Sequence, residues 1–167
     1  MGIEKKIQQR TIESRKKLLD AAYRLFVNKG YYNTNTKEIA HHAGVSIGNF
    51  YNYYQDKGEI YCALLEEYSA ASCKTMQELI DQLIAFDDRI AYKAFLSSSL
   101  CQLLDHSADH NRFFMDAVVI AKENMQVRSI IFQTEEKLID ILESFLKQRY
   151  PNRQMNYHIL ARMIYIL

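Results

Sequence analysis

Residues 34–57, TNTKEIAHHAGVSIGNFYNYYQDK, predict two short helices joined by a tight turn at Gly44. Asn35 and Glu38 have the spacing of a helix N-cap and its reciprocal capping carboxylate, so the first helix is expected to begin directly after Asn35. Gly44 stands where a chain leaving a helix needs a left-handed residue, a conformation that glycine adopts at little cost. Ser46 can cap the second helix. The layout is that of a helix-turn-helix, whose dominant use is to place its second helix in the major groove of DNA.

Apolar residues of this segment recur at helical spacing. Ile39 and Ala40 are expected to form the buried face of the first helix, and Phe50 with Tyr53 or Tyr54 the inward side of the second. The outward positions are then Lys37, His41 and His42 in the first helix and Asn49, Tyr51 and Asn52 in the second.

The segment and its flanks resemble the DNA-binding domain of TetR/AcrR-family transcriptional regulators. Residues 30–60, GYYNTNTKEIAHHAGVSIGNFYNYYQDKGEI, carry the helix-turn-helix. The preceding ESRKKLLDAAYRLFVNKGY resembles the family's first helix and its closing Gly-Tyr or Gly-Phe. The resemblance covers about residues 11 to 65, and beyond them extends only to the helical layout. It implies a homodimeric, ligand-responsive repressor that binds a roughly palindromic operator in double-stranded DNA.

Composition independently predicts an all-α protein. One proline and five glycines in 167 residues favour long helices over a turn-rich sheet protein. With 49% hydrophobic and 25% charged residues, the chain is expected to be globular and to bury a sizeable core. No apolar run approaches the roughly 20 residues needed to cross a bilayer. Three cysteines without C-x-x-C spacing indicate neither a disulfide framework nor a zinc site, so we expect a reducing cytoplasm.

The formal net charge of +1 conceals an asymmetry. Residues 1–58 carry ten Lys and Arg against five Asp and Glu, a net +5, whereas residues 59–167 carry eleven against fifteen, a net −4. A basic N-terminal third with an acidic remainder fits a nucleic-acid-binding head on a separate body, although charge fluctuation alone can produce a difference of this size.

We predict two domains from these patterns. Residues 1–56 are expected to form a helix-turn-helix DNA-binding domain, with a polar arm at 1–9 and a first helix from about Thr11 to Lys29. Residues 57–167 are expected to form a helical effector-binding and dimerisation domain, which the resemblance implies. Its last segment, HILARMIYIL, stops without a cap or a polar tail, so we expect the chain to be truncated at its C-terminus.

The second domain is expected to begin with a long helix. Asp56 and Glu59 repeat the capping spacing, so this helix should start at Lys57 and run without a breaker for roughly 28 residues, or about 42 Å. Such a length suits a strut between two domains. The later helices are expected at 88–104, 113–125, 127–149 and from about Arg153 to the terminus, with a polar break at 105–112.

Ten residues are predicted to contact DNA. Tyr51 and Asn52 can donate to phosphates, and Asn52 can alternatively reach a base edge; the bland alternative is a solvated polar pair. Gly48 lacks a side chain where backbone and DNA would approach closely. Ile47 cannot pair with phosphate but can touch a thymine methyl. The full set is Thr34, Thr36, Lys37, Ser46, Ile47, Gly48, Asn49, Tyr51, Asn52 and Lys57.

The basic residue that ends this set and the basic residues of the expected arm have different alternatives. Lys57 is expected to pair with a phosphate, as the resemblance implies, with a solvated lysine as the alternative. For Lys5, Lys6 and Arg10 in the expected arm, following a groove of DNA and simple solvation stay equally open.

For the second domain, the resemblance implies a small-molecule pocket. Aromatic and Met side chains suit an apolar or aromatic effector, although residues at such helical spacing are more often core. The candidate pocket residues are Tyr92, Phe95, Phe113, Phe114, Met125 and Phe132.

The sequence favours no other function. His106 and His110 would share one face of a helix, but a polar inter-helix loop explains them better than a metal site. Cys62 is expected to be a small core residue rather than a redox sensor. We find no catalytic constellation or phosphate loop, so we expect no enzyme, no cofactor and no metal. The alternative to a ligand-responsive repressor is a DNA-binding scaffold whose second domain binds a protein.

Overall fold

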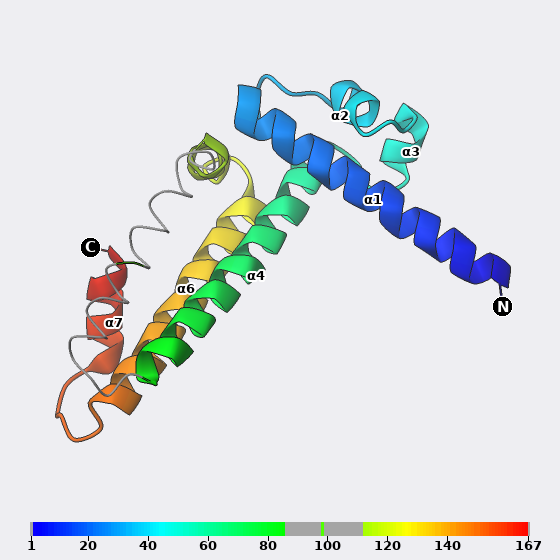
Figure 1. Cartoon of the computed structure of the whole chain (residues 1–167). Coiled ribbons are helices and arrows are strands. Elements are labelled where there is room, and N and C mark those ends of the chain that lie inside the picture. Colours follow the sequence, from blue (N-terminus) through cyan, green and yellow to red (C-terminus); the bar gives the residue numbers. More distant parts are fainter. Residues whose placement is uncertain (1, 86–97, 99–111, 167) are drawn as a thin grey trace. The chain divides into compact units, whose positions relative to one another are not determined.

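The computed structural model describes residues 2–85, 98 and 112–166, and every regular element among them is a helix. The labelled helices are α1 (Gly2–Lys29), α2 (Thr36–His42), α3 (Ile47–Tyr51), α4 (Lys57–Ile84), α6 (Met125–Arg149) and α7 (Tyr157–Ile166) (Figure 1). Residues 112–120 are also helical. The all-α class predicted from composition is confirmed. The expected helix at 88–104 and most of the polar break at 105–112 lie outside the described residues.

The prediction of a polar arm at residues 1–9 is wrong for the backbone, because α1 already begins at Gly2 and runs for 28 residues. Residues 3–10, IEKKIQQR, contain neither glycine nor proline. Glu, Lys, Gln and Arg lose little side-chain freedom in a helix, so nothing in this stretch opposes extension of the first helix toward the terminus.

The start of α2 agrees with the predicted capping box. The Asn35 side chain accepts from the backbone N–H of Glu38 at 3.0 Å, and the Glu38 carboxylate accepts from the N–H of Asn35 at 3.3 Å. The reciprocal pair satisfies two amide donors that a helix start otherwise leaves without a partner. The first helix of the helix-turn-helix therefore begins at Thr36, as predicted.

The turn between α2 and α3 has the predicted geometry. Gly44 has φ +67°, and Ser46 caps α3 by accepting from the N–H of Asn49 at 3.1 Å. A side chain at φ +67° is strained, because its Cβ crowds the neighbouring carbonyl. Glycine therefore lets the chain reverse within a few residues and start α3 beside α2.

Helix α4 begins at Lys57 and is 28 residues long, as predicted. Asp56 caps it by accepting from the N–H of Glu59 at 2.9 Å. Helix α6 starts at Met125, two residues before the expected start at Val127. The last helix starts later than predicted, at Tyr157, because residues 150–156 form turns around Pro151 and the Asn156 side chain caps α7.

The chain divides into two compact units. Among the described residues, the head unit comprises 2–66 and 112–127, and the second unit comprises 67–85, 98 and 128–166. The head unit thus extends past the predicted domain boundary at 56/57 and takes in a segment from the second half of the chain. Side-chain packing explains the extension, since Tyr61 and Phe113 are both fully buried in its core.

Aromatic rings form the centre of the head unit. Tyr61 lies 5.2 Å from Phe26 and 4.7 Å from Phe113, measured between ring centroids. The Tyr61 hydroxyl donates to the backbone carbonyl of Phe113 at 2.6 Å, which satisfies a polar group that burial would otherwise penalise. Three sequence-distant segments, namely α1, α4 and 112–120, are joined at this point.

The second unit contains a smaller core between α6 and α7. Ile139 and Leu146 of α6 and Ala161 of α7 are buried, with Leu142, Phe145, Tyr157 and Leu160 packed against them. Polar contacts reinforce the pair, since Glu143 accepts from the His158 ring and pairs with Lys147. The amphipathic face predicted for 127–149 is therefore used to hold α7.

Candidate nucleic-acid interface

The α2–α3 pair has a buried side and an exposed side. Ile39, Ala40, Phe50 and Tyr54 are all buried, and the Phe50 and Tyr54 rings lie 5.9 Å apart. This apolar floor fixes the orientation of α3, a helix of five residues that is too short to be stable alone. Of the two tyrosines considered for the inward side, Tyr54 is buried and Tyr53 is half-buried.

The exposed side of α3 presents most of the predicted contact residues. Tyr51 is 54% exposed and Ile47 38% exposed, and Ser46, Gly48 and Asn52 are exposed as well. Asn49 is half-buried and Asn52 is the C-cap of α3. On α2, Lys37 is exposed and Thr36 half-buried. The chain's own packing therefore leaves this surface available to an outside partner.

Tyr51 is linked to the start of α2. Its hydroxyl lies 3.3 Å from Oγ1 of Thr36, within hydrogen-bond distance, and its ring contacts Phe50 edge-on at 5.4 Å. One hydroxyl group from each helix thus lies next to the other on the exposed surface. Each hydroxyl can donate or accept, so the pair can bind a single anionic oxygen together.

Gly48 is not required by the packing of this chain. A Cβ atom placed on it meets no atom within 4 Å, and its backbone has an ordinary negative φ. The space beside it is open. A glycine that nothing inside the protein demands is consistent with close approach of an external surface to the backbone.

The prediction that Thr34 contacts DNA is not supported. Its side chain is 2% exposed, and its hydroxyl donates to the carbonyl of Gly30 at 2.9 Å. The backbone N–H of Thr34 donates to the carbonyl of Tyr31. Thr34 therefore holds the turn between α1 and α2 together. A sequence pattern alone does not separate such a turn threonine from an exposed one.

Lys57 has an internal role as well as its predicted one. Its ammonium donates to the carbonyl of Tyr31 at 2.8 Å and lies 4.2 Å from the centroid of the Tyr31 ring. Burial lowers the pKa of this half-buried ammonium from its ordinary value. An ammonium has three donors, so the contact with Tyr31 leaves it able to bind a phosphate too.

Lys29 belongs to the same region and was missed by sequence reasoning. Its ammonium lies 2.6 Å from the Glu38 carboxylate and so ties the end of α1 to α2. The hydrogen bond from Lys29 is the main reason why the pKa of Glu38 lies below its ordinary value. A nine-residue separation across a turn gives no periodic signal from which this pair is recognisable.

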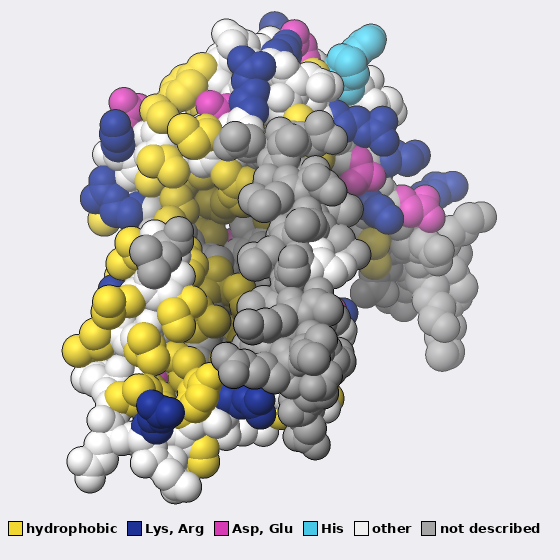
Figure 2. All heavy atoms as spheres, turned by 60° about the vertical axis from the view of Figure 1, so that its left-hand side comes forward, with side chains coloured by type: hydrophobic (Ala, Val, Ile, Leu, Met, Phe, Trp, Pro, Cys, Tyr) yellow, Lys and Arg dark blue, Asp and Glu magenta, His cyan; other side chains and the backbone are white. Residues whose placement is uncertain are grey.

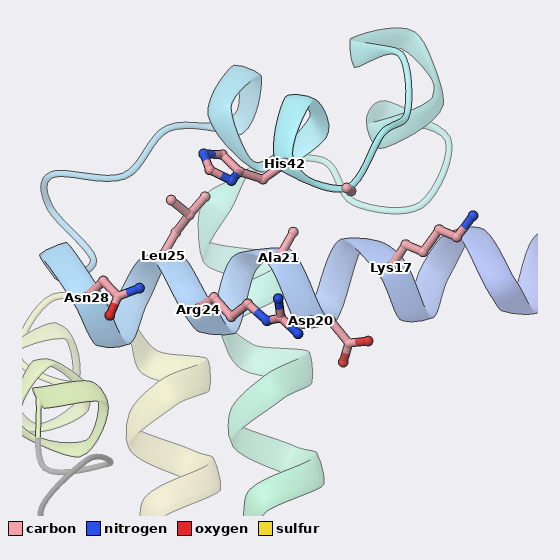
Figure 3. Close-up of a pocket in the computed structure, with 8 residues that line it drawn as sticks. Lys17, Asp20, Ala21, Arg24, Leu25, Asn28 and His42 are labelled. Atoms are coloured by element: carbon pink, nitrogen blue, oxygen red, sulfur yellow. The ribbon is translucent and has the colours of Figure 1, made fainter.

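An open groove of about 400 Å³ lies between α1 and α2. Figure 3 shows His42 of α2 above Leu25 of α1, with Lys17, Asp20, Arg24 and Asn28 along α1. Ala21, Leu25 and Ala43 provide its small apolar floor. None of the predicted effector residues lines this groove.

The predicted effector residues have different environments. Phe113 is fully buried in the aromatic core of the head unit, so it serves packing there. Phe114, Met125 and Phe132 are exposed. Tyr92 and Phe95 lie outside the described residues, and the candidate pocket stays a prediction.

Other candidate chemistry was also located. Cys62 is buried, and this burial raises the pKa of its thiol to about 11, as expected of a core residue. The carboxylates of Asp140 and Glu143 lie near the His158 ring, but Glu143 is already engaged by Lys147 and His158 between α6 and α7. His106 and His110 fall outside the described residues. None of the described helices is long and apolar enough to span a membrane.

Comparisons with known proteins agree with this geometry. Residues 18–64 match the family model of bacterial regulatory proteins of the tetR family. The chain is 24% identical over 146 residues to the fatty acid metabolism regulator protein of Bacillus subtilis, covering 87% of this chain and 73% of that protein.

Two solved structures share the fold. Escherichia coli NemR in its reduced form gives a TM-score of 0.72 at 20% identity, covering 92% of this chain and 82% of that one. FadR from Bacillus subtilis in complex with stearoyl-CoA gives a TM-score of 0.66 at 23% identity, covering 90% and 80%.

An exposed α3 above a buried floor, in a chain whose described regular elements are all helices, is the arrangement of helix-turn-helix DNA-binding proteins. Residues 18–64 form a DNA-binding domain of the tetR family, and the chain is a DNA-binding transcriptional regulator. The relatives are transcriptional regulators, a role without catalysis.

Proposed function

We propose that the protein is a homodimeric repressor that binds a palindromic operator through α2 and α3 and releases it when a small molecule with an apolar or aromatic part binds the second domain. The observation that carries the DNA-binding part is the exposed face of α3 directly after the left-handed Gly44. Phe50 and Tyr54 are buried on the opposite side, so the exposed face is not needed for the apolar packing of the head unit.

Nine of the ten predicted contact residues belong to the proposed interface, since Thr34 is buried in the turn. Lys37, Tyr51 and Lys57 are proposed to bind phosphates, which position the protein without reading sequence. Base edges are left to the outward residues at the start and end of α3. In the proposed contact set these are Ser46, Ile47, Asn49 and Asn52.

A dimer is supported by the apolar surface of α7. Ile159, Met163 and Ile166 recur at helical spacing and are 56%, 57% and 80% exposed. In the space-filling view, hydrophobic side chains run down the left-hand side and reach its lower part (Figure 2). A stripe of this kind on a short helix costs free energy in water, and covering it with the same helix of a second copy removes that cost. Two copies would present two α3 helices to successive major grooves, about 34 Å apart.

A long-chain acyl-CoA is the first effector to test. The Bacillus subtilis relatives are a regulator of fatty acid metabolism and a FadR structure that holds stearoyl-CoA. Among the candidate pocket residues, Phe132 lies exposed in the second unit, and an apolar side chain of this kind suits an acyl chain better than a polar metabolite. The effector must bind the DNA-incompetent state more tightly, because equal affinity for both states shifts nothing.

Two measurements test the proposal. Selection from a random duplex pool should enrich a palindrome, and the purified complex should contain two chains per duplex. The selected duplex should then be released by stearoyl-CoA but not by coenzyme A alone. A wild-type protein that binds all duplexes equally would refute sequence-specific regulation, whereas release only by aromatic compounds would correct the effector class.

A further inference from the structure

We infer that Arg112 and Asp116, more than fifty residues beyond the helix-turn-helix, are positioning residues for DNA binding. They hold the turn from which α2 starts and do so without touching DNA. The inference rests on the proposed function of α2 and α3 and names two residues that the sequence patterns did not single out. The argument starts from the head unit, to which residues 112–127 belong.

Asp116 binds the backbone amide of Tyr31, two residues after the end of α1. Its Oδ2 accepts from the N–H of Tyr31 at 2.6 Å. A carboxylate that accepts from a backbone amide forms a charge-assisted bond, which is shorter and stronger than a neutral one. The half-buried carboxylate thereby fixes the peptide plane directly after Gly30.

Arg112, one helical turn before Asp116, also binds the end of α1. Its Nη1 donates to the carbonyl of Asn28 at 2.8 Å. Residues four apart lie on one face of a helix, so Arg112 and Asp116 act side by side on the end of α1. The last carbonyls of a helix lack partners within the helix, and a guanidinium supplies one here.

Gly30 fits between the two side chains. It has φ +86°, and a Cβ placed on it would lie 3.2 Å from Oδ2 of Asp116 and 3.3 Å from Nε of Arg112. Both the left-handed conformation and the close approach of Asp116 and Arg112 call for glycine at this position. The glycine at position 30 and the two side chains at 112 and 116 therefore fit one another.

A continuous set of bonds leads from Tyr31 to α2. The carbonyl of Tyr31 accepts from the N–H of Thr34 at 3.2 Å and from the Lys57 ammonium at 2.8 Å. Thr34 also donates its hydroxyl to Gly30, and the next residue, Asn35, caps α2. Moving Tyr31 therefore moves the start of α2, on which the orientation of α3 depends.

The segment that carries the two residues is itself anchored. Phe113 is fully buried between them, and its carbonyl accepts from the Tyr61 hydroxyl at 2.6 Å. Ala117 and Ile120 are buried on the same segment. Arg112 and Asp116 are therefore held by the core and not by their own contact alone, as a positioning role requires.

The test compares specific with non-specific binding. Asp116→Ala and Arg112→Met, each in the full-length chain, should lower affinity for the selected palindrome at least tenfold. Affinity for a random duplex at low salt should change less than twofold, because that binding depends on charge rather than on helix placement. Asp116→Asn keeps an oxygen acceptor for the Tyr31 amide and should retain affinity for the palindrome within about threefold.

Two controls separate this role from simple destabilisation. Glu123→Ala removes the same charge from an exposed position in the head unit and should leave both affinities unchanged. The active fraction of each variant is measured by stoichiometric titration, since unfolding lowers both affinities equally. An unchanged ratio of specific to non-specific affinity in both Asp116→Ala and Arg112→Met overturns the inference. If the wild-type protein binds the palindrome and the random duplex with equal affinity, the proposed function itself is refuted.

Discussion

At the scale of single residues, the proposed interface rests on hydroxyl and backbone groups more than on charges. Tyr51 and Thr36 lie 3.3 Å apart on the exposed surface, while Lys57 also serves the interior. Groups of this kind contribute modestly one by one, so their cooperation is the property to measure.

Tyr51 and Thr36 are expected to act as a unit. Tyr51→Phe and Thr36→Val should each weaken operator binding several-fold, and the double variant should lose less than the sum of the two. A coupling free energy of about 0.5–1 kcal/mol is expected, because each single change leaves one hydroxyl without the other. The measurement is a double-mutant cycle on duplex affinity, and strictly additive losses would show that the two hydroxyls act separately.

Gly48→Ala should raise stability and lower DNA affinity. Alanine in a helix is favoured over glycine by roughly 0.5–1 kcal/mol, and the added methyl group meets no atom of the chain. Against DNA the same methyl group would meet the approaching backbone, so affinity should fall tenfold or more. Thermal melts and duplex titration measure the two effects. A stabilised variant with undiminished affinity would remove Gly48 from the interface.

Lys57→Met distinguishes the two roles of that residue. Loss of the bond to Tyr31 should lower the melting temperature. If the ammonium also binds a phosphate, affinity should fall on all duplexes, and the slope of log K against log salt should become shallower by about 0.9. A lowered melting temperature with an unchanged slope would assign Lys57 to the turn alone.

At the scale of helices, the starts of α2 and α4 and the turn before α3 could be predicted because neighbouring residues determine them. The capping box at Asn35 and Glu38, the left-handed Gly44 and the start of α4 at Lys57 all follow from residues within one turn of one another. The start of α1 at Gly2 does not follow from the pattern, because residues 3–10 are mostly polar and form a helix without a continuous apolar stripe to mark it. The contacts of Asp116 with Tyr31 and of Lys29 with Glu38 join helices, and no local rule anticipates them.

The pair of Lys29 and Glu38 should make the α1–α2 contact sensitive to acid. The folded-state pKa of Glu38 lies below its ordinary value of 4.5, so the pair stabilises the protein above that pH and ceases to do so as the pH falls through the lowered value. In Lys29→Met the stability lost on acidification below pH 4.5 should therefore be smaller than in the wild type. Thermal melts across this range measure the difference, and parallel pH profiles would show that the pair contributes nothing.

At the scale of the whole molecule, DNA binding by two α3 helices depends on how two chains are joined. A single α3 covers one half-site, and the second half-site adds affinity only when a partner holds another α3 at the matching spacing. In the proposed dimer, the exposed stripe on α7 is therefore as relevant to operator affinity as the residues proposed to face DNA.

Met163→Glu should separate the two copies. Met163 is 57% exposed in the middle of the apolar stripe, and a carboxylate there would be buried without a partner in the proposed interface. Its exposure in a single chain means that folding should be unaffected, while sedimentation should show monomers and operator affinity should fall at least a hundredfold. Gln148→Glu adds the same charge at an exposed position of α6 and should remain dimeric. A Met163→Glu protein that stays dimeric would place the interface elsewhere, because a buried unpaired carboxylate is not tolerated at the centre of an apolar contact.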